Sequence, residues 1–141
     1  MTESLGSDAL FDVVIDILAV TVLIDNRVKD RELVEFVHVS TLHNHDLRPE
    51  KILSRRMLLR LFDARTGRLM TALANDEDGS FKQNLLSKIK DKALQRSLLS
   101  SIFTIATCDY ELHDEESDFI KSALKVWNTH MPVHSEIEAV A

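Results

Sequence analysis

Residues 8–24 read Asp-Ala-Leu-Phe-Asp-Val-Val-Ile-Asp-Ile-Leu-Ala-Val-Thr-Val-Leu-Ile. The acids Asp8, Asp12 and Asp16 recur every four residues, which places them along one stripe of an α-helix, and nearly every other residue from 11 to 24 is apolar. The stretch is longer than a typical strand, and its apolar run is too short to span a bilayer. It therefore predicts a central and mostly buried helix.

The composition of the whole chain agrees with an all-α protein. A length of 141 residues fits one domain with one hydrophobic core. The chain has 3 glycines and 2 prolines, too few for the many turns of a β-sandwich or barrel. We expect a single domain over residues 1–141, a compact bundle of about six to seven helices.

Charge is distributed unevenly along the chain. The formal net charge of −6 is the sum of −6 over residues 1–47, +6 over 48–98 and −6 over 99–141. This alternation disfavours a general nucleic-acid binder. The single cysteine, Cys108, excludes an intramolecular disulfide and a cysteine-rich zinc site. No secretory signal pattern is present, so a cytoplasmic location is expected.

Capping and breaking residues indicate where the helices begin and end. Residues 43–46 (His-Asn-His-Asp) are expected to end the second helix at about Leu42, and Pro49 suits the first turn of a third helix towards Asp63. Gly67 leaves 64–75 as either a continued helix or a turn with a short helix. The predicted N-caps of the other helices are Asp30, Ser80, Asp91 and Asp114.

Two segments of the chain repeat at an offset of 84 residues. Residues 25–32 read Asp-Asn-Arg-Val-Lys-Asp-Arg-Glu, and residues 109–116 read Asp-Tyr-Glu-Leu-His-Asp-Glu-Glu. Both follow an apolar helix, both have the pattern Asp-x-x-(Val or Leu)-x-Asp-x-Glu, and both lead into an amphipathic helix. We expect two pseudo-symmetric helix–acidic loop–helix units at about 8–43 and 92–128, joined by a basic helical middle over 48–90.

These loops resemble those of the tellurite-resistance TerB-like family, in which helix pairs flank a loop of the form Asp-Gly-x-(Val/Ile)-x-x-x-Glu. Residues 105–112 (Ile-Ala-Thr-Cys-Asp-Tyr-Glu-Leu) are the closest match, and residues 23–28 (Leu-Ile-Asp-Asn-Arg-Val) are the second. The resemblance implies a compact helical fold, a link to metal-ion or chemical stress, and suspected metal binding within larger assemblies. The glycine of the family loop is replaced by Asn26 and Tyr110, and tyrosine adopts a left-handed backbone only at a cost.

The acidic loops are the first candidate site, with two interpretations. Helix capping and the macrodipole account for the acids at the helix starts without any ligand. Asp25 and Asp109, in contrast, end helices where the dipole disfavours a negative charge, so they are either Asx-turn acceptors or cation ligands. As oxygen ligands the acids would suit Ca²⁺ or Mg²⁺ in a site weaker than an EF-hand. The candidate metal ligands are Asp25, Asp30, Glu32, Asp109, Asp114 and Glu116.

The basic middle and the histidines supply two further candidates. Arg48, Lys51 and Arg55 are expected to share one helical face, and a solvated face is weighed against docking of an acidic protein, an anionic ligand or an anionic membrane. Arg56 and Arg60 lie beside that face. The six histidines would form a zinc site only through tertiary contacts, so capping or exposed roles are favoured. They are His38, His43, His45, His113, His130 and His134.

No nucleophile elbow, Gly-rich phosphate loop or His-Glu-x-x-His motif is present. The sequence therefore favours a non-enzymatic TerB-like binding or adaptor module with a protein partner. The alternatives are a metal-dependent hydrolase with paired carboxylates, which needs both loops in one concave pocket, and a ligand-free protein-interaction domain.

Overall fold

The computed structural model describes residues 6–25, 27–108 and 112–128. Within these residues the chain is all-helical, as predicted, with no strand. The six helices are α1 (Ser7–Leu23), α2 (Asp30–Leu47), α3 (Arg55–Ala74), α4 (Ser80–Ser87), α5 (Lys92–Ala106) and α6 (Asp114–Val126). None of the described helices has the length and apolar character needed to cross a membrane.

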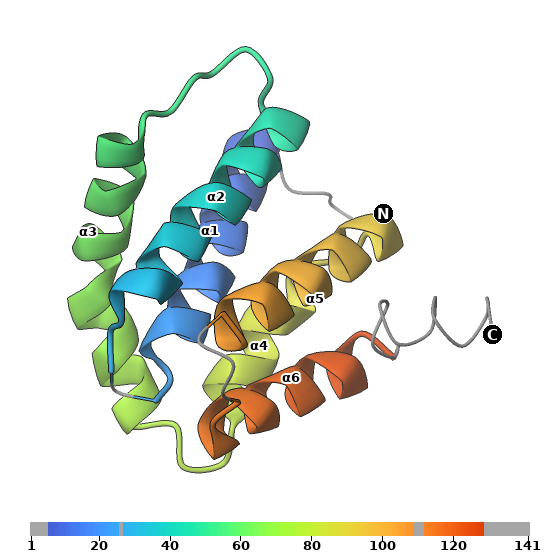
Figure 1. Ribbon diagram of the computed structural model, residues 1–141. Helices are drawn as coiled ribbons and strands as arrows, with labels where there is room; N and C mark the ends of the chain where they lie inside the picture. Colours follow the sequence, from blue (N-terminus) through green and yellow to red (C-terminus); the bar gives the residue numbers. More distant parts are fainter. Residues whose placement is uncertain (1–5, 26, 109–111, 129–141) are drawn as a thin grey trace, which may run out of the picture.

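The other helices pack around α1. This helix contacts α2, α3, α4 and α5, and every residue from Ile17 to Leu23 is buried. In Figure 1, α1 lies behind α2, with α3 along one edge of the molecule and α4, α5 and α6 on the other side. Burial of each large aliphatic side chain contributes about 1.5–3 kcal/mol. The prediction of a central, buried first helix is confirmed.

The acidic stripe of α1 is neutralised by the basic middle of the chain. Asp16 accepts hydrogen bonds from Arg65 Nε at 2.8 Å and from Arg68 Nη2 at 2.9 Å, and Arg65 also pairs with Asp12. The side chains of Arg65 and Asp16 are only 13% and 16% exposed. These ion pairs fix α3 against α1.

The segment before α3 is not helical, which corrects two predictions. Arg48 and Lys51 both bind Asp8, at 3.1 and 3.0 Å, and the hydrogen bonds from Lys51 and then Arg48 lower the pKa of that carboxyl. The Arg48 guanidinium also lies 4.0 Å from the centroid of the Phe11 ring. The expected common helical face of Arg48, Lys51 and Arg55 is therefore wrong.

A serine, and not Pro49, caps the start of α3. The side chain of Ser54 accepts a hydrogen bond from the backbone N–H of Met57 at 3.2 Å, and α3 starts at Arg55. Pro49 lies outside the helix, in a turn. From there α3 continues through Gly67 to Ala74, so the ambiguous 64–75 stretch is continuous helix as far as Ala74.

The predicted break at residues 43–46 is wrong, because these residues continue α2 to Leu47. Tertiary contacts satisfy their polar groups. Asn44 Nδ2 donates to the Lys51 carbonyl at 2.7 Å, and His43 Nε2 lies 2.9 Å from Ser101 Oγ of α5. His43 is buried, and burial lowers its pKa. The expectation of a capping or exposed role therefore fails for His43.

The start of α4 is also capped differently from the prediction. The Asp76 carboxylate accepts hydrogen bonds from the backbone N–H groups of Phe81 at 2.9 Å and Lys82 at 3.3 Å. Gly79 precedes the helix with φ +78°, a left-handed conformation that glycine adopts without strain. Ser80 is therefore the first residue of α4 and not its cap. Asp91, in contrast, caps α5 as predicted, with its carboxylate accepting from Leu94 N at 2.8 Å.

Replacement of Asp16 by Asn tests the contribution of the α1–α3 ion pairs. We expect the free energy of unfolding to fall by about 1–3 kcal/mol, because the half-buried Arg65 loses a charged acceptor. Urea denaturation measures the change. Asp63→Asn, at an exposed position of α3, is the matched control and should change stability by less than about 0.5 kcal/mol. Equal losses in the two variants would contradict this role of Asp16.

Candidate metal centre

The two acidic loops of the repeat meet in the structure. Lys29 Nζ lies 3.0 Å from His113 Nε2, and these positions are 84 residues apart, which is the offset of the repeat. The carboxyl groups of Glu32 and Glu116, at the same offset, are in contact with each other. Equivalent positions contact one another when an approximate twofold axis passes between them. The α1–α2 and α5–α6 units are therefore pseudo-symmetric about this contact.

Both glutamates lie in the first turn of a helix and point into the protein. Glu32 belongs to α2 and Glu116 to α6, and each residue is 1% exposed. Glu116 Oε1 accepts a hydrogen bond from the backbone N–H of His113 at 3.2 Å. A helix N-terminus favours a nearby negative charge, which partly offsets the cost of burying these acids.

Three oxygens at this contact lack a hydrogen-bond donor among the described residues: Asp25 Oδ2, Glu32 Oε1 and Glu116 Oε2. Burial, the contact with Glu116 and the charge of Asp25 raise the pKa of Glu32 to about 8. Burial also raises the pKa of Glu116. A buried carboxylate pair is costly unless a proton or a cation lies between its members.

Three side chains at the same contact are arranged as cation ligands. One ligand atom from each of Asp25, His113 and Glu116 lies within 4.8 Å of the other two. Ligands on opposite sides of a divalent ion are about 4–5 Å apart, since metal–ligand bonds are about 2.0–2.6 Å long. Glu32 adjoins this group through Glu116. We refer to Asp25, Glu32, His113 and Glu116 as the carboxylate–histidine cluster.

The structure brings together three of the predicted ligands, Asp25, Glu32 and Glu116. Asp30 and Asp114 are instead exposed, as the first residues of α2 and α6. They are not N-caps as predicted, since the extended residues before the two helices are Lys29 and His113. Asp109 lies outside the described residues.

Asp25 itself is partly explained by local structure. Its Oδ1 accepts a hydrogen bond from the backbone N–H of Arg27 at 3.0 Å, the Asx-turn contact that the sequence left as one alternative. Its other carboxylate oxygen, Oδ2, is buried and has no donor among the described residues. The turn and a cation role are therefore compatible, because each uses a different oxygen.

Two residues of this contact, Lys29 and His113, were not among the predicted ligands. The sequence presents His113 only as one of six histidines and gives no reason to single out Lys29. The sequence feature that could have identified both residues is their position in the repeat. Each lies immediately before an Asp that begins a helix. Residues beside a pseudo-twofold axis meet each other even when their types differ.

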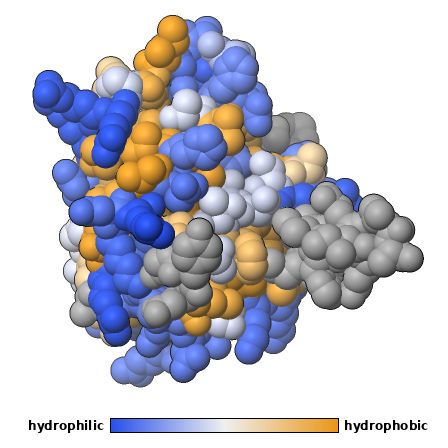
Figure 2. Space-filling view, viewed as in Figure 1, coloured by the Kyte–Doolittle hydropathy of each residue, from blue (hydrophilic) through white to orange (hydrophobic). Residues whose placement is uncertain are grey.

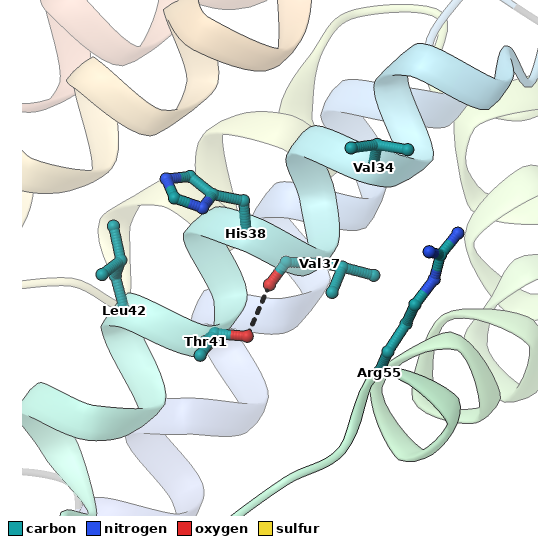
Figure 3. A pocket seen from close by; sticks show the side chains of 6 residues that line it. All are labelled: Val34, Val37, His38, Thr41, Leu42 and Arg55. Atoms are coloured by element: carbon teal, nitrogen blue, oxygen red, sulfur yellow. Dashed lines mark hydrogen bonds between the residues drawn. The ribbon is translucent and has the colours of Figure 1, made fainter.

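A separate hollow lies on the outer face of α2. It has a volume of about 410 Å³ and is lined by Val34, Val37, His38, Thr41, Leu42 and Arg55. In Figure 3, the α2 side chains spread along the helix surface while Arg55 reaches towards them from the start of α3. Val34 and Leu42 are 50% and 54% exposed. On the face seen in Figure 2, apolar side chains gather over this part of the molecule.

Comparisons of the chain with profiles of known protein families, with curated proteins and with solved structures find no match. The TerB-like resemblance therefore rests on the two loop sequences. The function of the chain is inferred below from the geometry of the cluster and of the α2 hollow.

The raised pKa of Glu32 predicts a pH-dependent stability in the presence of a chelator. The folded state holds the proton more tightly than the unfolded chain, where the pKa is close to 4.5. The contribution of Glu32 to stability is therefore fully present at low pH and is lost as pH rises through about 8. Between pH 7 and pH 9 we expect a loss of about 1 kcal/mol in the free energy of unfolding.

Glu32→Gln provides the control, because the amide donates a hydrogen bond to Glu116 without titrating. Its stability should change less between pH 7 and pH 9 than that of the wild type, as measured by urea denaturation. If the two proteins lose the same stability over this range, the titrating group lies elsewhere.

Proposed function

We propose that the protein is a non-enzymatic helical binding module of the TerB-like type that binds a divalent cation at the carboxylate–histidine cluster. The observation that carries the proposal is the convergence of one ligand atom each from Asp25, His113 and Glu116 within 4.8 Å. Buried oxygens of Asp25, Glu32 and Glu116 that have no donor among the described residues lie at the same contact. Helix capping does not explain them, since a cap accepts hydrogen bonds from backbone N–H groups. A cation would satisfy these oxygens and neutralise the buried charge.

Bound between the loops, the cation would join the two halves of the repeat. Asp25 follows α1, whereas His113 and Glu116 belong to the start of α6. A ligand that bridges these segments stabilises the folded state and sets the relative position of α2 and α6. The link to metal-ion or chemical stress, and a cytoplasmic location, remain parts of this proposal that rest on the sequence.

No observation favours the hydrolase alternative. Glu32 and Glu116 are almost fully buried, whereas catalysis at a metal needs an open position facing a substrate. The α2 hollow is lined by other residues and contains none of the cluster. The cluster therefore has the character of a structural or regulatory site.

Melting temperatures with and without cation test the metal site. For chelator-stripped protein we expect a divalent ion at about 100 times its Kd to stabilise the fold by about 2–3 kcal/mol, a rise of several degrees. Glu116→Gln should abolish the rise and remain folded, because it removes one member of the like-charge pair. Asp114→Asn, an exposed acid two residues away, should keep the rise. A rise of equal size in both variants would contradict the assignment.

The adaptor part of the proposal concerns the α2 hollow. Arg55, Arg56 and Arg60 are exposed and form no ion pair with a described carboxylate, unlike Arg48 and Lys51. Apolar side chains beside unpaired arginines fit an amphipathic helix with carboxylates along its rim. A protein partner of that chemistry is favoured over nucleic acid, because no phenylalanine, tyrosine or tryptophan is among the described residues that line the hollow.

Substitution of the exposed apolar residues tests this surface. Val34→Ser with Leu42→Ser should leave the melting temperature nearly unchanged and weaken capture of an acidic helical partner at least tenfold in quantitative affinity purification. Val28→Ser, at an exposed apolar position outside the hollow lining, is the control and should retain the partner. A partner retained equally by all of these variants binds elsewhere.

A further inference from the structure

The ligand atoms of the cluster indicate which class of cation it takes, an inference that rests on the proposed function. The sequence suggested Ca²⁺ or Mg²⁺, because every predicted ligand was a carboxylate. The structure adds the imidazole of His113, which shares the 4.8 Å grouping with Asp25 and Glu116. Imidazole nitrogen suits Zn²⁺ and related transition metals, whereas Ca²⁺ and Mg²⁺ prefer oxygen ligands alone.

The number and burial of the ligands point in the same direction. Ca²⁺ takes six to eight oxygens, often including waters, and Mg²⁺ keeps several waters of its own. Glu32 and Glu116 are each 1% exposed, which leaves little room for a hydrated ion. Zn²⁺, in contrast, takes four ligands, of which Asp25, His113 and Glu116 can supply three, with Glu32 adjacent to Glu116.

The ammonium group of Lys29 is a cation that already interacts with His113. Its Nζ lies 3.0 Å from His113 Nε2. Because an ammonium group only donates hydrogen bonds, this contact requires the tautomer of His113 in which Nε2 carries the lone pair. The Lys29 charge also lowers the pKa of Glu32, opposite to the effect of Asp25. A metal ion that uses the same lone pair must displace the ammonium group.

We propose that the carboxylate–histidine cluster is selective for a transition-metal dication of the Zn²⁺ class, with His113 as the residue that determines selectivity and Lys29 as a tethered competitor for its nitrogen. Displacement is sterically possible because Lys29 is half-buried, at the end of a loop, with a side chain long enough to reach solvent. Without metal, the ammonium group partly compensates the carboxylates. With metal, the ion takes over that role and binds the carboxylates directly.

Isothermal titration calorimetry of the chelator-stripped full chain with Zn²⁺ and with Ca²⁺ tests the proposal, and Co²⁺ absorption in the visible range reports nitrogen ligation. We expect Zn²⁺ to bind at least about 100-fold more tightly than Ca²⁺. His113→Gln should weaken Zn²⁺ at least about tenfold, change Ca²⁺ by less than about threefold, and shift the Co²⁺ spectrum. His45→Gln, an exposed histidine of α2, is the control and should change none of these values.

Lys29→Met gives an independent readout. It removes the competing charge and keeps the apolar stem, so affinity for Zn²⁺ should rise by about tenfold. If Ca²⁺ or Mg²⁺ binds at the cluster more tightly than Zn²⁺ and His113→Gln has no effect, the selectivity proposal is wrong while the proposed function stands. If no divalent ion binds, or if Glu116→Gln leaves Zn²⁺ affinity unchanged, both are wrong.

Discussion

The packing around α1 constrains the rest of the fold. Because α2, α3, α4 and α5 all contact this helix, its buried face extends around most of its circumference, and only the stripe of Asp8, Asp12 and Asp16 remains polar. That stripe requires cations, and the basic middle of the chain supplies them through Arg48, Lys51, Arg65 and Arg68. These four basic side chains of residues 48–98 therefore form ion pairs within the chain.

The packing of helices around α1 also places the two repeat loops against each other. α2 and α5 both pack on α1, and α6 packs on α5, so the loop after α1 and the loop after α5 reach a common contact. Pseudo-symmetry then pairs like with like: glutamate with glutamate, and lysine with histidine. A glutamate in the first turn of a helix carries little energetic cost in either unit alone. When the two units meet, Glu32 and Glu116 become a buried pair of acidic groups.

Sequence reasoning identified the local determinants of the fold more readily than the tertiary ones. The period of four in α1 and the Asp91 cap depend on neighbouring residues and were predicted correctly. The continuation of α2 through His43 and Asn44 depends on Ser101 and Lys51, which are distant in the chain. Likewise, Asp76 caps α4 from outside the usual N-cap position.

The candidate site shows the same division. The repeat pattern singled out Asp25, Glu32 and Glu116, because their spacing is visible in one dimension. It did not distinguish them from Asp30 and Asp114, which face solvent, since burial depends on how the helix starts are oriented. His113 could not be assigned to the cluster from the sequence alone. The pseudo-twofold axis decides which loop residues touch, and its position is visible only in the structure.

Three positive species can neutralise the charge at this contact: a proton, the Lys29 ammonium group and a metal ion. A proton between Glu32 and Glu116 satisfies their oxygens but leaves Asp25 Oδ2 without a donor. Lys29 reaches His113, yet a single flexible ammonium cannot contact three carboxylates and an imidazole at once. A dication accepts several ligands at fixed angles and so serves the whole cluster. The three species therefore compete for one site, and the occupant with the highest charge and coordination number also fixes the two halves of the repeat most firmly.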